Sequence, residues 1–227
     1  MPHTALLLFS KTASAEARDK TLINRSRNSN FLAIDALIKR AHNIARQSAL
    51  PLFIHSEKDQ RGLTFGEKLH SSVKYVFDQG FEKVIVIGND CPRLSLSHIH
   101  NAVYQLETHD HVLAPTKKGG IYLAGYCRSS FAPHYNDIRW QSEFAYHDLC
   151  ASAQQRKITV YHLLYLDHIK KAKDHLQDFY HLPVVDTFKL FIQSILSSIY
   201  NLYSASSVFF KLRDACVIVL RGPPVIF

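Results

Sequence analysis

The sequence predicts an α/β domain built around one sheet. Short apolar runs rich in β-forming residues alternate with stretches in which apolar residues recur every three to four positions. This alternation is typical of a sheet that is covered by helices. The chain has 227 residues, 47% of them hydrophobic, which is enough to bury a core but favours a single domain with an appendage.

Each predicted element follows from a local pattern. Strands are expected at residues 5–9, 51–55, 83–88, 111–115 and 159–167, and a further strand lies among the glycines of residues 117–126. Residues 10–22 are predicted to form a loop. Three amphipathic helices are expected between the strands, with these buried faces: Ile34, Leu37, Ile38, Ala41, Ile44 and Ala45; Leu69, Val73, Val76 and Phe77; Ile99, Ala102, Val103 and Leu106.

The composition narrows the class of protein. The net charge is +8, with basic residues concentrated near the N-terminus, which favours anionic partners. The four cysteines show no paired spacing, so neither a zinc knuckle nor a disulfide framework is predicted, and a cytoplasmic location fits. The first apolar run is too short for a signal peptide, and no segment has the uninterrupted apolar length of a transmembrane helix.

The C-terminal part of the chain differs from the rest. We expect a nucleotide-binding domain at residues 1–182 and an amphipathic appendage at residues 183–227. The appendage has three alternatives: it packs on the domain, it forms a homodimer with a second copy, or it lies on a membrane surface. Packing on the domain is the preferred interpretation.

A strand that ends on a carboxylate gives the main functional hypothesis. In "VIVIGNDCPRLS", four apolar β-formers lead directly to Asp90. Open α/β sheets bind ligands at the carboxyl ends of their strands, and a carboxylate there can hold Mg²⁺ or Mn²⁺ against the phosphates of a nucleotide. The alternative is that Asn89 and Asp90 only begin a turn before Pro92.

The basic loop after the first strand is the second candidate. Lys11, Arg18 and Lys20 can neutralise a diphosphate, although the loop lacks the glycines of a P-loop. The alternative is a basic loop exposed to solvent. The histidine pairs His98/His100 and His109/His111 are predicted to lie at the surface rather than to bind a metal.

Several segments, in order and spacing, resemble one known family. The segments "FGEKL", "GFEKVIVIGNDCPRLS", "HVLAPTKKGGIYLAGY", "IRWQS" and "LLYLD" are similar to the domain-of-unknown-function 2064 family of small GT-A-fold proteins, over about residues 5–175. The resemblance implies a GT-A-like (nucleotide-diphospho-sugar transferase) three-layer α/β/α sandwich with a mostly parallel mixed sheet, plus a C-terminal helical appendage. It also implies a glycosyltransferase-like or nucleotidyltransferase-like activity.

The same resemblance assigns roles to individual residues. Asp90 corresponds to the acid that faces a metal, and Asp167, at the end of the last strand, corresponds to a second metal or substrate contact. Lys20 corresponds to the basic residue of the nucleotide loop. Gly119 and Gly120 correspond to two glycines that let the substrate approach the backbone.

Lys118 departs from the family pattern, and the role of Trp140 has two alternatives. Lys118 stands where the family usually has an aspartate, so a cation replaces an acid beside the expected phosphates. Lys118 can supply positive charge for catalysis in place of a metal contact, or the site can bind without turnover. Trp140 either lines the acceptor side of the site or anchors the core.

Two functions from different classes therefore remain. The first is a metal-dependent transferase that uses a nucleotide or nucleotide-sugar donor. The alternative is a catalytically degenerate GT-A scaffold that binds a nucleotide or a partner protein. Nucleic-acid binding is not expected, because the aromatic residues lie in apolar segments and do not interleave with a basic face.

Overall fold

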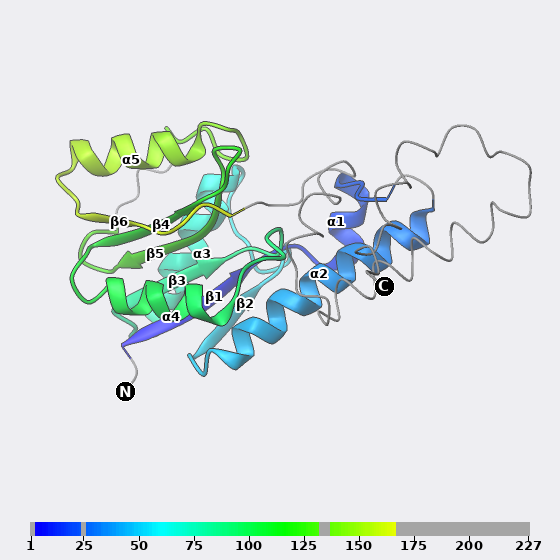
Figure 1. Ribbon diagram of the computed structural model, residues 1–227, viewed down its shortest axis with the longest axis horizontal. Coiled ribbons are helices and arrows are strands. Elements are labelled where there is room, and N and C mark those ends of the chain that lie inside the picture. Colours follow the sequence, from blue (N-terminus) through cyan, green and yellow to red (C-terminus); the bar gives the residue numbers. More distant parts are fainter. Residues whose placement is uncertain (1–2, 24–25, 132–136, 167–227) are drawn as a thin grey trace, which may run out of the picture. The chain divides into compact units, whose positions relative to one another are not determined.

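The computed structural model describes residues 3–23, 26–131 and 137–166, and it contains one six-stranded sheet (Figure 1). The strands are β1 (Thr4–Phe9), β2 (Leu52–His55), β3 (Lys83–Ile87), β4 (His111–Pro115), β5 (Ile121–Cys127) and β6 (Val160–His162). Their order is β2-β1-β3-β5-β4-β6, and every strand except β5 runs in the same direction. The predicted mostly parallel mixed sheet is confirmed. Asp167 and the predicted appendage at residues 183–227 lie outside the described residues.

Five helices are present in the described ranges: α1 (Ala13–Asp19), α2 (Arg27–Gln47), α3 (Phe65–Asp78), α4 (Leu96–Gln105) and α5 (Ala145–Gln155). Their ends follow from local sequence. Thr64 and Glu67 form a capping box at the start of α3, and Gly80 follows that helix with a φ of 98°. Ser95 is the N-cap of α4.

The helices cover both faces of the sheet. Because side chains alternate along a strand, Leu6 and Leu8 of β1 pack in one cluster with α2 and α4, while Ala5 and Leu7 pack in another with α3 and α5. Figure 1 shows α5 on one side of the strands and α4 on the other. The predicted three-layer α/β/α sandwich is therefore confirmed for the described residues.

Three local predictions were wrong. The predicted loop at residues 10–22 contains α1, whose two turns are too short for a periodic pattern but are capped by Thr12 and packed on α2. The predicted strand at residues 159–167 is regular only as β6, after which one isolated bridge pairs Thr116 with Leu166. His111 is only 4% exposed, because it begins β4 in the interior and contacts the ring of Tyr126.

None of the helices in the described ranges combines the length and the hydropathy that a membrane crossing requires.

Candidate functional site

The largest group of predicted site residues meets in a cavity of about 630 Å³ at one edge of the sheet. The cavity lies where β1, β3 and β4 reach their carboxyl ends, and β1 and β3 are neighbours from which the chain continues toward opposite edges of the sheet. Such a position is the usual ligand site of an open α/β sheet. Its lining includes Phe9, Lys11, Glu16, Lys20, Phe65, Asn89, Asp90, Thr116, Gly120, Tyr122 and Trp140.

Asp90 and Lys20 face each other in this cavity. The Lys20 Nζ atom lies 2.6 Å from Asp90 Oδ1 and 3.3 Å from Glu16 Oε1. The side chains of Lys20 and Glu16 are 12% and 11% exposed, whereas that of Asp90 is 38% exposed. The predicted metal-facing acid and the predicted phosphate-binding lysine are thus brought together, across 70 residues of sequence, as one ion pair.

Glu16 connects α1 to the end of β3. Its Oε1 accepts from Lys20, and its Oε2 accepts a hydrogen bond of 2.7 Å from Asn89 Nδ2. Burial raises the pKa of Glu16, against the lowering effect of the nearby Lys20 ammonium, and the Asp90 carboxylate raises it further. The buried carboxyl group therefore depends on these two partners to offset its lost hydration.

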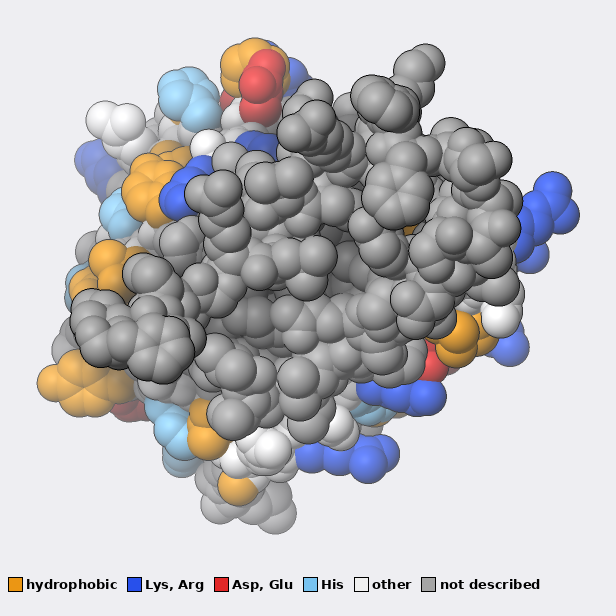
Figure 2. Space-filling view, turned by 45° about the vertical axis from the view of Figure 1, so that its right-hand side comes forward, with side chains coloured by type: hydrophobic (Ala, Val, Ile, Leu, Met, Phe, Trp, Pro, Cys, Tyr) orange, Lys and Arg blue, Asp and Glu red, His pale blue; other side chains and the backbone are white. Residues whose placement is uncertain are grey.

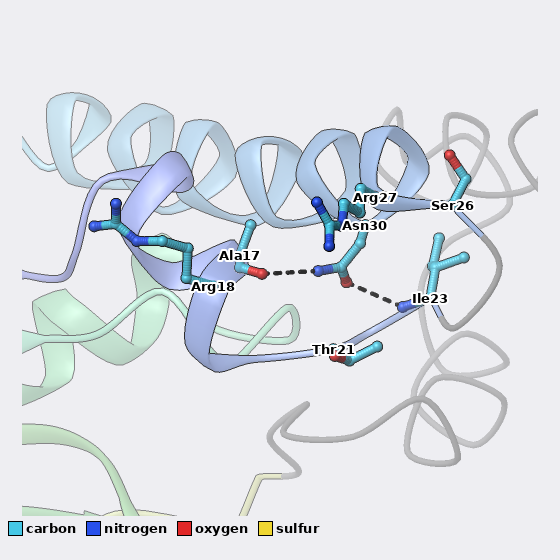
Figure 3. A pocket seen from close by; sticks show the side chains of 7 residues that line it. All are labelled: Ala17, Arg18, Thr21, Ile23, Ser26, Arg27 and Asn30. Atoms are coloured by element: carbon cyan, nitrogen blue, oxygen red, sulfur yellow. Dashed lines mark hydrogen bonds between the residues drawn. The ribbon is translucent and has the colours of Figure 1, made fainter.

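Further contacts fix the segment that carries Lys20. Thr12 caps α1 and donates to Glu57 from its backbone N (2.6 Å) and from Oγ1 (2.8 Å). The buried Asn30 of α2 donates from Nδ2 to the Lys20 carbonyl oxygen (2.9 Å) and accepts from the backbone N of Leu22 (2.7 Å). Figure 3 shows Asn30 reaching from α2 toward this segment. The backbone is consequently fixed both before Lys20, by the contacts of Thr12, and at and after Lys20, by the contacts of Asn30.

The other two basic residues of this segment lie in different places. Lys11 lines the main cavity, where its Nζ lies 2.5 Å from Asp19 Oδ2. Arg18 instead lines a second cavity of about 650 Å³ between α1 and the start of α2, together with Arg27 (Figure 3). The structure does not bring Arg18 together with the Lys20–Asp90 pair.

The turn between β4 and β5 contributes Gly120 to the described cavity lining, but neither Gly119 nor Lys118. The Gly120 backbone N donates to Thr116 Oγ1 (2.9 Å), and Gly120 lines the cavity. Gly119 has a φ of 75°, and a Cβ on it would lie 1.8 Å from the Glu143 carbonyl oxygen. The glycine at position 119 is therefore required by the protein's own backbone. Lys118 is exposed and is absent from the described lining of the cavity.

One wall of the cavity is aromatic. Trp140 is half-buried, and its ring centroid lies 5.4 Å from that of Phe65, which in turn lies 5.6 Å from that of Phe9. The neighbouring Arg139 is held by Asp148, which accepts from Arg139 Nε (2.9 Å) and Nη2 (2.7 Å). Trp140 thus both lines the cavity and packs against the core, so neither of its two predicted roles excludes the other.

The described residues of the cavity fit a metal that is coordinated partly by a bound substrate, and they do not fit a metal that is coordinated by protein side chains alone. No group of three His, Cys, Asp or Glu side chains with a metal-binding arrangement occurs in the described part of the chain. Asp90 is the half-exposed carboxylate of the cavity, and one of its oxygens contacts Lys20. Mg²⁺ is commonly bound by one or two carboxylates together with substrate phosphates and water, and Asp90 fits that arrangement.

Sequence reasoning missed Glu16, Asn89 and Asn30. Glu16 lies four positions before Lys20, a spacing that pairs charges on a helix, but this signal requires that residues 13–19 be recognised as helical. Asn89 precedes Asp90, and the sequence indicates for it only the alternative of a turn before Pro92. No local signal identifies Asn30, because its partners are set by the packing of α2 against α1.

The described surface shows no single concentration of positive charge on the face drawn in Figure 2. Lysine and arginine side chains lie at several separate places there, with acidic and histidine side chains among them. Several basic residues near the N-terminus are paired with nearby carboxylates. Lys11, which precedes α1, is paired with Asp19 at the end of that helix, and Lys39 is paired with Asp35 within α2.

The mixed sheet and the position of the cavity define a fold of the GT-A-like, nucleotide-diphospho-sugar transferase class. The solved structure of a protein from Desulfovibrio desulfuricans G20, provisionally named a nucleotide-diphospho-sugar transferase, matches with a TM-score of 0.77 and 19% identity. The match covers 90% of this chain and 98% of that chain. The chain belongs to the family described as "Uncharacterized protein conserved in bacteria (DUF2064)", whose model matches residues 22–142.

Other solved structures are more distant. Rv0371c from Mycobacterium tuberculosis H37Rv, in complex with manganese, matches with a TM-score of 0.48 and 9% identity over 79% of this chain and 98% of that chain. The 4-diphosphocytidyl-2C-methyl-D-erythritol synthase from Anaerococcus prevotii DSM 20548 has the same TM-score and identity, over 86% and 97%. No curated protein matches the chain.

Proposed function

We propose that this protein is a metal-dependent transferase that uses a nucleotide-activated donor and transfers a glycosyl or nucleotidyl group. The observation that carries the proposal is the Asp90 carboxylate at the carboxyl end of β3, facing Lys20 inside a cavity of about 630 Å³. A cavity of this size accommodates a nucleotide-sized ligand. The GT-A-like fold supports the same class of donor.

The charge of the cavity supports the need for a divalent cation. Its described lining contains the lysines Lys11, Lys20 and Lys68, and the same number of carboxyl groups, Glu16, Asp19 and Asp90. Two of these lysines are already paired with carboxylates. The lining therefore has little spare positive charge for a diphosphate, and Mg²⁺ or Mn²⁺ bound through Asp90 would supply charge stabilisation for the leaving phosphate.

The chain's own groups would bind and orient the donor. Lys20 and Lys11 line the cavity and would contact phosphate oxygens, and Gly120 would leave space for the donor beside the β4–β5 turn. Trp140 and Phe65 form an apolar wall that would exclude water from part of the cavity when the donor is bound. Asp167 remains a proposed second metal contact, from the family resemblance alone.

A thermal-shift screen tests this proposal. Nucleotides and nucleotide sugars are each added with Mn²⁺, with Mg²⁺ and with a chelator, because a ligand that binds only the folded state raises the Tm. A ligand at about one hundred times its Kd is expected to raise the Tm by roughly 5 to 10 °C. This shift should depend on the metal and should occur with one family of nucleotides.

The matched variants are Asp90→Asn and Asp78→Asn. Asp78 is also a lysine-paired carboxylate, but it lies on α3 and is paired with Lys74 there. We expect Asp90→Asn to abolish the metal-dependent shift and to reduce transfer at least about a hundredfold, while Asp78→Asn keeps both. The absence of a shift with every nucleotide in folded wild-type protein would contradict the proposal.

A further inference from the structure

The Lys20 ammonium contacts the Asp90 carboxylate, the group that would bind a metal in the proposed function. It lies 2.6 Å from Asp90 Oδ1 and 3.3 Å from Glu16 Oε1. We propose that Lys20 is the resident cation of this site and excludes a divalent metal from Asp90 until the donor's phosphates arrive together with the metal. This inference rests on the proposed function and specifies that the metal binds together with the donor and not before it.

The burial of the pair makes the exchange unfavourable for a metal alone. The side chains of Lys20 and Glu16 are almost enclosed, so movement of the ammonium into water would leave the buried Glu16 carboxyl group without its ion pair, although it would keep the hydrogen bond from Asn89. A metal that displaced Lys20 from Asp90 while Lys20 stayed nearby would place two cations side by side. Like charges at such a distance repel each other.

Phosphate changes this balance. A diphosphate brings negative oxygens that can contact the metal and the Lys20 ammonium simultaneously. Both cations therefore have an anionic partner when Asp90 exchanges its contact with Lys20 for the metal. The metal and the donor are therefore expected to bind together, and the free protein is expected to hold Lys20 on Asp90.

Glu16 keeps Lys20 in place during the exchange. When Asp90 turns to the metal, Lys20 retains its contact with Glu16, which is itself fixed by the hydrogen bond from Asn89. Helix α1, which carries Glu16, is anchored at its other end by the bonds between Thr12 and Glu57. Glu16 is therefore a positioning residue: it acts on the phosphates through Lys20.

Direct titration with Mn²⁺ in the absence of nucleotide tests the inference. The electron paramagnetic resonance signal of free aqueous Mn²⁺ decreases as the ion binds protein, so no enzyme activity is needed. We expect wild-type protein to leave the signal unchanged. Lys20→Gln removes the ammonium and leaves Asp90 and Glu16 facing the same space, so its affinity for Mn²⁺ should rise at least about tenfold.

The matched control is Lys74→Gln, which removes one positive charge from an exposed ion pair on α3. It should bind no more Mn²⁺ than the wild type, which separates the local exchange from the general effect of net charge. Circular dichroism establishes that both variants are folded. If wild type and Lys20→Gln bind Mn²⁺ equally, the inference is overturned, whatever the Mn²⁺ affinity of Lys74→Gln.

Wild-type protein provides a test that needs no variant. Millimolar Mn²⁺ alone should leave the Tm unchanged, whereas Mn²⁺ with ADP should raise it, and equal stabilisation by Mn²⁺ alone would overturn the inference. The proposed function fails separately: it is contradicted if no nucleotide stabilises the protein. A gain of Mn²⁺ binding in Lys20→Gln would support the exchange at Asp90 even in that case.

Discussion

Gly119 shows how a single residue can be constrained by the protein and not by a ligand. Its φ of 75° disfavours any side chain, and an added Cβ would meet the Glu143 carbonyl oxygen. We expect Gly119→Ala to lower the free energy of unfolding by more than about 2 kcal/mol. Gly80→Ala is the control, because Gly80 has a φ of 98° but no atom within 4 Å of an added Cβ.

Denaturant unfolding of both glycine variants measures the difference. Gly80→Ala should lose only the conformational part of the cost, about 1–2 kcal/mol, while Gly119→Ala loses this and the contact with the backbone of residue 143. If the two variants are equally stable, the packing of Glu143 against the β4–β5 turn does not constrain position 119.

Substitution of Lys118 can distinguish an active transferase from a catalytically degenerate scaffold. It replaces the family's usual aspartate, yet its side chain is exposed and lies outside the described cavity lining. Because exposed charges interact weakly through water, we expect Lys118→Asp to change nucleotide affinity less than about fivefold, measured by calorimetry. A large gain in donor hydrolysis would instead support a scaffold that has lost its catalytic acid, and a loss of activity would make Lys118 part of the site.

At the scale of elements, the segment between β5 and α5 positions the aromatic wall. Arg139 donates to Asp148 of α5 from its backbone and its guanidinium, which also lies over the Phe144 ring at 4.0 Å. These hydrogen bonds from Arg139 hold the pKa of Asp148 below its usual range. The ion pair therefore joins this segment to a regular helix beside Trp140.

Fluorescence can test this role, because Trp140 is the only tryptophan of the chain. Arg139→Ala is expected to shift the Trp140 emission to longer wavelength and to increase its quenching by acrylamide roughly twofold, since the segment loses its anchor. Arg46→Ala, an exposed arginine at the end of α2, is the control. Unchanged emission in Arg139→Ala would show that packing against Phe65 is sufficient to hold Trp140.

For the whole molecule, we expect His111 to contribute to the dependence of stability on pH. Burial lowers the pKa of His111 to about 4, and the nearby Arg156 acts in the same direction. Its Nε2 atom is buried without a hydrogen-bond partner among the described residues. Protonation in the folded state would thus place a charge in the interior that the nearby Asp110 offsets only in part.

The sign of the effect follows from proton binding. The unfolded chain takes up the proton near pH 6.5 and the folded protein only near pH 4, so stability falls as the pH is lowered through this range. The loss from this residue reaches about 3 kcal/mol. Denaturant unfolding between pH 4 and 7 should show a smaller loss in His111→Gln than in His100→Gln, a control at the exposed surface of α4. Parallel curves would exclude His111 as the cause.

Local sequence patterns identify most of the strands, three of the five helices in the described ranges and one edge of the site. Apolar runs and helical periodicity placed five of the six strands closely and the core faces of α2, α3 and α4, because these patterns express local rules of side-chain direction. The position of Asp90 followed from the end of β3. The family resemblance added the GT-A-like fold within the α/β class, because no local pattern specifies it.

Which residues meet in the site depends on contacts between distant segments. Lys20 and Asp90 are joined because β1 and β3 are neighbours in the sheet and α1 is held against α2, a relation that spacing in the sequence does not express. Glu16 becomes a partner of Lys20 and Asn89 through the same packing, and His111 is buried because β4 lies inside the sheet. Contacts between distant segments depend on strand order and helix packing, whereas local patterns determine only the elements that are packed.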